Sequence, residues 1–256
     1  MVKYLLKKSY QLKDLKEIEF KDLWGDRGVF TTMWIFKNPS KILFFKEHIN
    51  NLIKSAKAFS ISKSSLRSDI LRLIKNNINS KVRYNHLLRV AVNKSILSIS
   101  LRKRIKPKLN FDLKLVKLKR QKPEFKNLKY KEIIKHLSKL DNSKSDIGLC
   151  SNKKIFETGT SNLLFVKDDK FFSPIDKFYK GITYKFFKSK IKKITRKDIF
   201  VSNLKEFDEI ILIGSGKGVA SVKTINQIKW KRKSLKFYKI LSKHYQSAIN
   251  KCPRYK

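Results

Sequence analysis

The order of apolar and polar positions in the N-terminal part of the chain predicts strands that alternate with amphipathic helices. Residues 29–36, VFTTMWIF, are β-branched and aromatic, as is typical of a buried strand. The turn NPSK follows, and ILFFK at 42–46 is predicted to complete a hairpin. In residues 47–59 apolar side chains recur at helical spacing, which predicts a helix with one apolar face. The rest of this α/β unit is a helix at 62–80 and strands at 86–93 and 95–104.

A proline-containing segment separates this unit from a second one. IKPKLNF at 105–111 has no helical period, so we place a linker at 106–112, between a domain of residues 1–105 and a larger domain of residues 113–256. In the larger domain we expect strands at 112–119, 146–150, 154–157, 162–167, 170–174 and 209–214, and helices at 127–140, 181–194 and 235–249.

A formal net charge of +42, from 62 Lys and Arg against 20 Asp and Glu, first suggests nucleic acid as a partner. The bases are mostly lysine, however, and they are spread from Lys3 to Lys256 in short patches. This distribution favours a drift toward A/T-rich codons and argues against a nucleic-acid partner. A non-catalytic basic protein that binds nucleic acid is kept as the alternative of another class.

Cysteines, histidines and apolar runs argue against several other classes. Cys150 and Cys252 form no CxxC pair and the chain has four His, which argues against a disulfide framework or a metal site. No apolar run approaches the ~20 residues of a membrane helix, and the N-terminus lacks the pattern of a signal peptide. We therefore expect a cytoplasmic protein with a small-molecule substrate.

Two turns could bind a phosphate. GSGKG at 214–218 follows an apolar strand, and successive N–H groups of such a turn can form an anion-binding nest. Alone it could equally be a tight connection, because it lacks P-loop spacing and Val219 breaks GxGxxG. In KGITYKFF, Ile182 and Thr183 begin a predicted helix, where N–H groups and the helix dipole favour a phosphate.

A lysine, a tyrosine and a carboxylate complete a set of groups that suits pyridoxal 5′-phosphate (PLP). In EFKNLKY, Lys126 lies just ahead of a predicted helix and Tyr130 follows four residues later. Glu157 ends a short strand before TGTSN. PLP needs a lysine amine, an anion beside its pyridine nitrogen, a donor near its ring oxygen and N–H groups for its phosphate. In so lysine-rich a chain, Lys122 and Lys129 remain alternatives to Lys126.

These motifs together resemble the class IV, or branched-chain-type, PLP enzymes over nearly the whole chain. The strongest match is ETGTSNLLFVKDDKFFSP with the later KGIT. GVFTTMWIFKNPSKILFFKEHINNLIKSAKAF and FDEIILIGSGKGVASV are similar to the family's N-terminal segment and final phosphate turn. The resemblance implies a two-domain α/β (α+β) fold, a small N-terminal and a larger C-terminal domain with the cofactor at their interface, and a homodimer.

The resemblance also assigns roles to individual residues. Lys126 matches the catalytic lysine, which carries the cofactor covalently and moves the proton. Glu157 matches the carboxylate on the pyridine nitrogen, and Tyr130 falls at a ring-side position. The phosphate-binding positions match Ile182, Thr183, Ser215 and Gly216.

Three positions depart from the family pattern. Asn51 stands where His-x-x-Arg usually supplies an arginine to the phosphate, Tyr184 replaces an Arg after Gly-Ile-Thr, and Lys129 replaces an Asn. The loss of an arginine removes a charge-assisted contact. Lys54 or Lys217 could compensate for it.

Within the family, the resemblance favours 4-amino-4-deoxychorismate lyase, which gives 4-aminobenzoate and pyruvate in folate biosynthesis. Thr31 stands where the aminotransferases usually carry Glu, and GSGKGVASV also looks more like the lyases. In that reaction Lys126 removes the ring proton. The alternative is a branched-chain or D-amino-acid aminotransferase. Candidate substrate contacts are Phe30, Thr32, Arg89 and Arg102.

Overall fold

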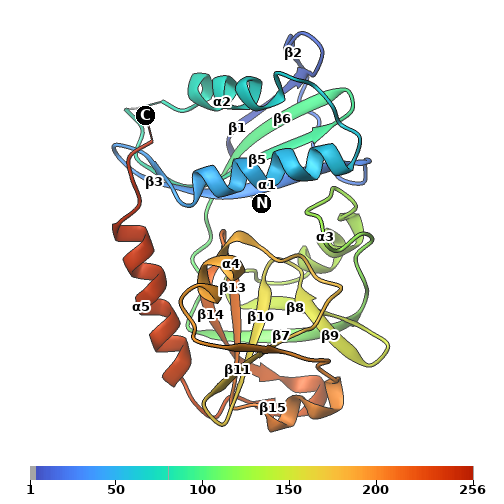
Figure 1. The fold of residues 1–256 in the computed structure, drawn as a ribbon, viewed down its shortest axis with the longest axis vertical. Coiled ribbons are helices and arrows are strands. Elements are labelled where there is room, and N and C mark those ends of the chain that lie inside the picture. The colour runs from blue at the N-terminus through green and yellow to red at the C-terminus, as the bar shows by residue number, and fades with distance from the viewer. Residues whose placement is uncertain (1–3, 80, 256) are drawn as a thin grey trace. The chain divides into compact units, whose positions relative to one another are not determined.

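The structure is a computed structural model that describes residues 4–79 and 81–255 (Figure 1). The chain divides into two compact units that share the sequence unevenly. Unit 1 takes the chain through Arg104, together with Phe125–Lys131 and the C-terminal residues from Lys251. Unit 2 consists of Ile105–Glu124 and Glu132–Asn250. Each unit contains one β-sheet, so the predicted mixed α/β fold class is confirmed.

Unit 1 has a six-stranded antiparallel sheet in the order β2-β1-β6-β5-β3-β4. Its strands are β1 (Tyr4–Gln11), β2 (Glu17–Ile18), β3 (Gly28–Lys37), β4 (Lys41–Ile42), β5 (Tyr84–Asn93) and β6 (Ile96–Lys103). Its helices are α1 (Phe45–Ala58) and α2 (Leu66–Asn77).

The two faces of this sheet differ in what covers them. Met33 and Leu88 belong to a large apolar core that includes Ile49 of α1 and Ile70 of α2. Because side chains alternate along a strand, Phe30 points to the opposite face. There it joins a smaller apolar cluster with Leu23, Ala91 and Leu128. The candidate substrate residues lie on this second face, as described below.

Two predicted elements of this region are wrong in extent. The strand expected at 42–46 is only Lys41–Ile42, because Phe44 takes a left-handed conformation with φ 54° and α1 begins at the next residue. The helix expected at 127–140 is only α3 (Lys131–Leu137). Residues 126–128 instead extend beside β3, where Phe30 N–H donates to Lys126 O at 2.9 Å and Leu128 N–H donates to Gly28 O at 2.9 Å.

Unit 2 has a nine-stranded mixed sheet in the order β12-β11-β10-β13-β14-β7-β8-β9, with β15 beside β14. The pairs β14–β7, β7–β8 and β11–β12 are parallel and the others antiparallel. Its strands are β7 (Asn110–Lys117), β8 (Ser145–Ser151), β9 (Lys154–Thr158), β10 (Asn162–Lys167), β11 (Lys170–Ser173), β12 (Ile194–Arg196), β13 (Glu209–Gly214), β14 (Gly218–Ile225) and β15 (Trp230–Lys231).

Phenylalanine side chains fill the core of unit 2, and α3, α4 and α5 follow its strands. Phe111, Phe165 and Phe207 are fully buried in this core. The helix expected at 181–194 is the shorter α4 (Ile182–Lys188), and the C-terminal helix is α5 (Lys236–Asn250), which runs beside β13 and β14 (Figure 1). The short 3-10 helices are η1 (Val201–Glu206) and η2 (Asn226–Ile228).

A buried carboxylate fixes where α5 begins. Glu209 is 0% exposed and accepts the N–H groups of Phe237 and Tyr238 at 2.9 Å each. A carboxylate on the first N–H groups of a helix is favourable because those donors have no partner within the helix. Among the helices of the described residues, none is both long enough and apolar enough to span a membrane.

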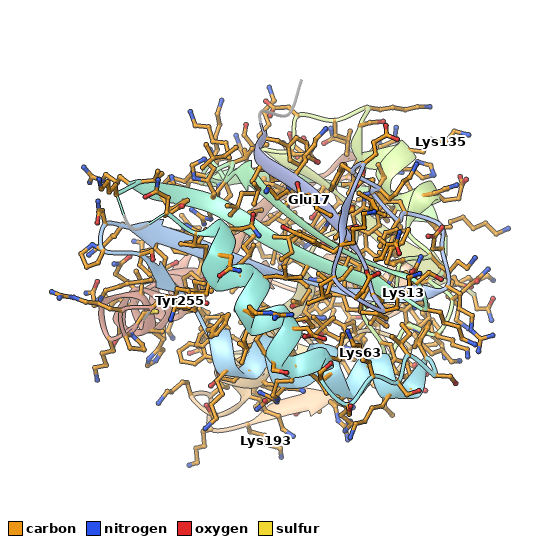
Figure 2. All side chains as sticks on the ribbon, turned by 90° about the horizontal axis from the view of Figure 1, so that it is seen from above. Lys13, Glu17, Lys63, Lys135, Lys193 and Tyr255 are labelled. Atoms are coloured by element: carbon orange, nitrogen blue, oxygen red, sulfur yellow. The ribbon has the colours of Figure 1, made fainter. Side chains whose placement is uncertain are left out.

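Basic side chains extend outward over both units (Figure 2). Lys13, Lys135 and Lys193 are exposed examples from well-separated parts of the sequence. Solvated lysine ammonium groups of this kind need no partner. The functional interest therefore lies in the few charged groups that are buried.

Candidate functional site

Lys126 is held beside β3 by its backbone. Residues 126–128 pair with residues 28–30, and Val29 and Asn127 form an isolated bridge. This pairing puts the Lys126 ammonium over the ring of Phe30, 5.1 Å from the ring centroid. Lys126 is half-buried, whereas Lys129 is exposed and its ammonium donates to Gly25 O at 2.7 Å.

The Phe30 ring beside this lysine belongs to a group of three aromatic rings. Phe30 packs edge-on against Trp24 at 4.8 Å and against Tyr130 at 5.6 Å between ring centroids. Trp24 and Tyr130 are 5.7 Å apart. We call Lys126, Phe30, Tyr130 and Trp24 the lysine cluster. It brings together three residues that the sequence singled out separately.

Thr31 points to the other face of the sheet, toward α1. Its Oγ1 lies 2.7 Å from Nδ1 of His48 in a buried hydrogen bond. Burial, followed by the positive charge of Lys126, lowers the pKa of His48 from 6.5 to about 3. The imidazole is therefore neutral at ordinary pH, and the Thr31 hydroxyl is committed to it.

The four candidate substrate residues share one face of unit 1. Thr32 stands opposite Arg89 across β3 and β5, and Phe30 stands opposite Ala91. Arg102 on β6 is opposite Leu87, two positions along from Arg89, so its side chain lies on the same face.

Of the two arginines on this face, Arg89 is buried and Arg102 is half-buried. Arg89 is 8% exposed, donates to the carbonyl and carboxylate of Asp22, and lies over the ring of Trp24 at 4.3 Å. Burial lowers the pKa of Arg89 and of Arg102, and Asp22 opposes this effect on Arg89. A guanidinium in such surroundings interacts strongly with a carboxylate.

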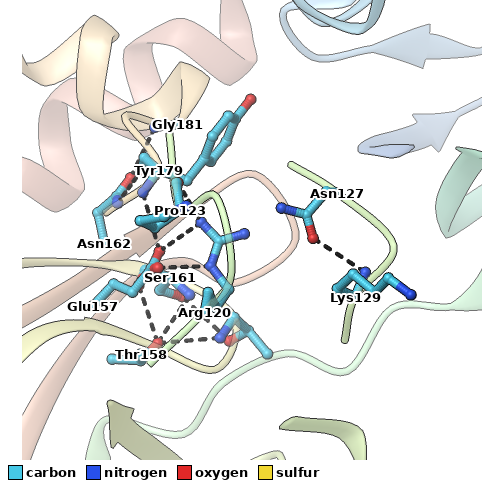
Figure 3. Close-up of polar contacts among 11 residues, drawn as sticks. Arg120, Pro123, Asn127, Lys129, Glu157, Thr158, Ser161, Asn162, Tyr179 and Gly181 are labelled. Atoms are coloured by element: carbon cyan, nitrogen blue, oxygen red, sulfur yellow. Dashed lines mark hydrogen bonds and ion pairs between the residues drawn. The ribbon is translucent and has the colours of Figure 1, made fainter. Parts of the chain in front are cut away.

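In unit 2, Glu157 at the end of β9 is bound by an arginine that the sequence did not single out. Arg120 Nε donates to Glu157 Oε1 at 2.7 Å, and Arg120 Nη2 reaches Oε2 at 3.4 Å (Figure 3). The side chains are 2% and 7% exposed. Arg120 Nη2 also donates to Pro123 O at 2.7 Å, and the N–H of Tyr179 donates to Oε2 at 3.3 Å. Glu157 therefore has a buried, charge-assisted partner.

Asn162 connects the strand after Glu157 to the start of α4. Its amide donates to Tyr179 O at 2.5 Å, and its Oδ1 accepts the N–H of Gly181 at 3.1 Å (Figure 3). A Cβ at Gly181 would lie 2.8 Å from this same oxygen, so glycine fits the approach. Asn162 therefore fixes the segment that leads into Ile182 and Thr183.

The two predicted phosphate turns meet in unit 2. Oγ1 of the buried Thr183 lies 3.2 Å from Oγ of Ser215, and Ile182 precedes Thr183 at the start of α4. Ser215 and Gly216 lie in the turn between β13 and β14. Tyr184 stands where the family usually has an arginine. Its hydroxyl lies 3.0 Å from Oγ of the buried Ser173 and not at the Thr183–Ser215 pair.

Asn51, another position that departs from the family pattern, lies on α1 in unit 1. Its carbonyl accepts the Ser55 hydroxyl at 2.8 Å. Lys54 is exposed on the same helix. The sequence-predicted residues therefore form two sets, with Lys126, Tyr130 and the four substrate candidates in unit 1, and Glu157, Ile182, Thr183, Ser215 and Gly216 in unit 2.

Arg120 and His48 are the residues that sequence reasoning missed. Arg120 stands in RQKP, which is typical of a turn. Nothing near it in the sequence distinguishes it from the rest of the 62 bases or indicates that it pairs with Glu157. The available signal was indirect: a carboxylate predicted in a buried strand needs a donor. His48 is the His of the family's His-x-x-Arg motif, in which Asn51 replaces the Arg. Its hydrogen bond to Thr31 could not be predicted, because it depends on how α1 packs on β3.

Comparisons with known proteins agree with this fold. A family model described as "Amino-transferase class IV" matches residues 28–225. No curated protein matched the chain by sequence. Among solved structures, the branched-chain aminotransferase of Thermoproteus uzoniensis with norvaline has a TM-score of 0.74 at 15% identity, over 95% of this chain and 93% of that one.

Two further structures widen the comparison. A branched-chain amino acid aminotransferase from the organism abbreviated T.th., complexed with N-(5'-phosphopyridoxyl)-L-glutamate, has a TM-score of 0.73 at 14% identity, over 97% and 96% of the two chains. A Legionella pneumophila protein proposed to be a 4-amino-4-deoxychorismate lyase has a TM-score of 0.69 at 17% identity, over 87% and 91%. The chain belongs to the class IV aminotransferase family, whose enzymes depend on PLP.

Proposed function

We propose that this protein is a PLP-dependent 4-amino-4-deoxychorismate lyase, which splits its substrate into 4-aminobenzoate and pyruvate. The observation that carries the choice is Thr31. It occupies the β3 position where the aminotransferases of the family usually carry Glu, and its hydroxyl is engaged by the neutral His48 at 2.7 Å. No carboxylate is therefore presented at this point of β3. The similarity to the Legionella pneumophila protein is in keeping with this choice.

The residues of unit 2 fit the cofactor. Glu157 is a buried carboxylate bound by the Arg120 guanidinium at 2.7 Å, and a carboxylate is the kind of group that can hold a proton on a pyridine nitrogen. Thr183 and Ser215 bring two hydroxyls within 3.2 Å of each other, which suits a phosphate with several acceptor oxygens. When bound, PLP supplies an electron sink for the charge left by proton removal.

Lys126 is the proposed catalytic residue. A lysine that carries a cofactor covalently needs its amine in the site and not in bulk solvent. Lys126 is half-buried and its side chain reaches the ring of Phe30, whereas Lys122 and Lys129 are exposed. We propose that Lys126 Nζ carries the cofactor and takes the ring proton of the substrate. Tyr130, in contact with Phe30, is proposed to lie beside the cofactor ring.

Arg89 and Arg102 are proposed to meet the substrate carboxylates. They share a face with Phe30 and Thr32, which would contact the ring of the substrate. Arg89 is already oriented by Asp22 and Trp24, so little side-chain entropy would be lost when a carboxylate binds. We further propose that the protein acts as a homodimer in the cytoplasm, as the family resemblance implies.

The test is a parallel assay of the purified protein with PLP. Release of 4-aminobenzoate and pyruvate from 4-amino-4-deoxychorismate is measured beside transamination of branched-chain and D-amino acids. The lyase proposal expects the first activity, its loss in Lys126→Ala, and its retention in the matched variant Lys129→Ala. Transamination alone would replace it with the aminotransferase alternative. Neither activity, no cofactor binding and a salt-sensitive shift of DNA would favour the basic binding protein.

A further inference from the structure

A second buried ion pair lies in unit 2 and takes no part in the chemistry proposed above. Lys217, in the turn Gly214–Gly218 between β13 and β14, donates from Nζ to Asp146 Oδ2 at 2.7 Å. The side chains are 9% and 0% exposed. Lys217 also lies over the ring of Phe111, 4.1 Å from its centroid. Lys217 thus differs from the many exposed lysines among the 62 bases of the chain.

Asp146 binds two segments at once. Besides Lys217, its Oδ2 accepts the hydroxyls of Thr158 at 2.9 Å and Thr160 at 2.6 Å, and its Oδ1 accepts the N–H of Ile147 at 2.8 Å. Thr158 directly follows Glu157, and its own hydroxyl accepts the N–H of Ser161 at 2.8 Å. The carboxylate thus joins the turn after Glu157 to the turn that contains Ser215.

The two turns also pack directly against each other. A Cβ added at Gly214 would lie 3.1 Å from Ser161 Oγ and 3.2 Å from Thr160 O. A shift of either turn would therefore disturb the other. Ser215, whose hydroxyl lies 3.2 Å from that of Thr183, follows Gly214 directly.

We propose that Asp146 and Lys217 are positioning residues that hold the phosphate turn Gly214–Gly218 against the turn Thr158–Ser161, and that Lys217 orients this turn without neutralising the phosphate. The inference rests on the proposed cofactor roles of Glu157 and Ser215. On this proposal, Lys217 does not replace the arginine that is absent at Asn51. An ammonium already paired with a buried carboxylate brings no net charge to a phosphate.

The decisive variant is Asp146→Asn. It keeps an oxygen for the two threonines and removes the charge that holds Lys217. The dissociation constants of PLP and of pyridoxal, which has no phosphate, are measured by absorbance titration of the apoprotein. We expect PLP affinity to fall about tenfold or more, as for coupled residues in one network. Pyridoxal affinity, which does not depend on the phosphate turn, should change much less.

Two rival accounts predict different results for this variant. If Lys217 is the phosphate cation, Asp146→Asn releases it and PLP binds more tightly. If the pair only stabilises the fold, PLP and pyridoxal weaken by the same factor. Either result overturns the proposal, and so does an unchanged PLP affinity. A wild-type protein that fails to bind PLP at all would instead reject the proposed function itself.

Variants of Lys217 provide the control for folding. Lys217→Arg keeps the ion pair and should retain most of the wild-type PLP affinity, whereas Lys217→Met removes the pair and should lose that affinity. The double variant Asp146→Asn/Lys217→Met should recover thermal stability relative to Lys217→Met, because no charge is left buried alone. Its PLP affinity should stay low. Lys223→Met, which removes an exposed lysine from β14, is the matched variant expected to change neither quantity. If the double variant recovered PLP affinity together with stability, the proposal that the pair positions the phosphate turn would be contradicted.

Discussion

The lysine cluster of unit 1 and the buried ion pairs of unit 2 deal with charge in opposite ways. The Lys126 ammonium lies over the ring of Phe30, and on the other face of β3 the imidazole of His48 is kept neutral. In unit 2, Glu157 and Asp146 are each bonded to a basic side chain at 2.7 Å and to further donors. We call Glu157, Arg120, Asp146 and Lys217 the carboxylate network.

This difference separates two tasks. The proposed reacting amine, Lys126, is half-buried and lies over the aromatic ring of Phe30. Groups that hold a cofactor in place benefit from several short bonds to a fixed charge, so charge is paired in the carboxylate network. Substitutions in the lysine cluster should therefore remove chemistry, while substitutions in the carboxylate network should affect stability and cofactor retention.

Arg120→Met gives the largest expected effect. It leaves Glu157 buried without its guanidinium, and the loss of one partner of a buried pair typically costs about 3–5 kcal/mol. The free energy of unfolding, measured by urea titration, should fall by this amount. Lys119→Met, which removes the neighbouring exposed lysine, is the control and should leave it unchanged. A loss below about 1 kcal/mol, the range of exposed pairs, would show that the carboxylate network is not held as described.

The pH dependence of the unfolding free energy tests whether His48 is buried as a neutral imidazole. The pKa of His48 is about 3 in the folded protein and 6.5 in the unfolded chain, so the unfolded chain binds more protons between these values. Stability from this group is therefore present above pH 6.5 and is lost as the pH falls toward 3. Between pH 6.5 and 4.5 we expect a loss of about 2–3 kcal/mol from this group.

His48→Gln should remove this contribution and flatten the profile, measured by urea unfolding at several pH values. His136→Gln, on α3, serves as the matched variant and should leave the profile as in the wild type. An unchanged slope in His48→Gln would mean that His48 is not buried in its neutral form.

Thr31→Val probes the single hydrogen bond that carries the functional choice. The substitution keeps the shape of the side chain but leaves a buried nitrogen of His48 without the hydroxyl. We expect a loss of about 1–2 kcal/mol in unfolding free energy. Thr32→Val, on the opposite face of β3, should cost less. Equal losses for the two variants would indicate that the Thr31–His48 bond contributes nothing.

Lys167→Ala should have the smallest effect. Lys167 and Glu206 lie 2.8 Å apart, but their side chains are 34% and 43% exposed. Solvent screens such a pair, so the melting temperature should not change measurably. A clear destabilisation would show that distance alone, and not burial, decides what an ion pair contributes in this protein.

Many strands of both sheets were predictable because their apolar and β-branched residues form compact runs, but no strand was predicted at β1 (Tyr4–Gln11) or β14 (Gly218–Ile225), nor at the short β2, β12 and β15. The segments at 29–36 and 209–214 fall within β3 and β13. The failures come from context that no local pattern contains. Phe44 turns the chain with a positive φ. Residues 126–128, predicted to be helical, form backbone hydrogen bonds to β3 instead.

The site was predictable where a motif marks a residue, and not where a residue acts through a partner. Glu157, Thr183 and Ser215 stand in recognisable turns, and their proposed roles remain predictions. Arg120 and Asp146 stand in segments that read as an ordinary turn and strand. Only the folded chain pairs them with Glu157 and Lys217.

The most direct test of the central assignment is the visible absorbance of the purified protein after PLP is added. We expect a visible band in the wild-type protein, its loss in Lys126→Ala, and its retention in Lys129→Ala, with all three proteins folded by circular dichroism. A band that persists in Lys126→Ala, or one that is absent from the wild type, would contradict the assignment of Lys126 as the residue that carries the cofactor.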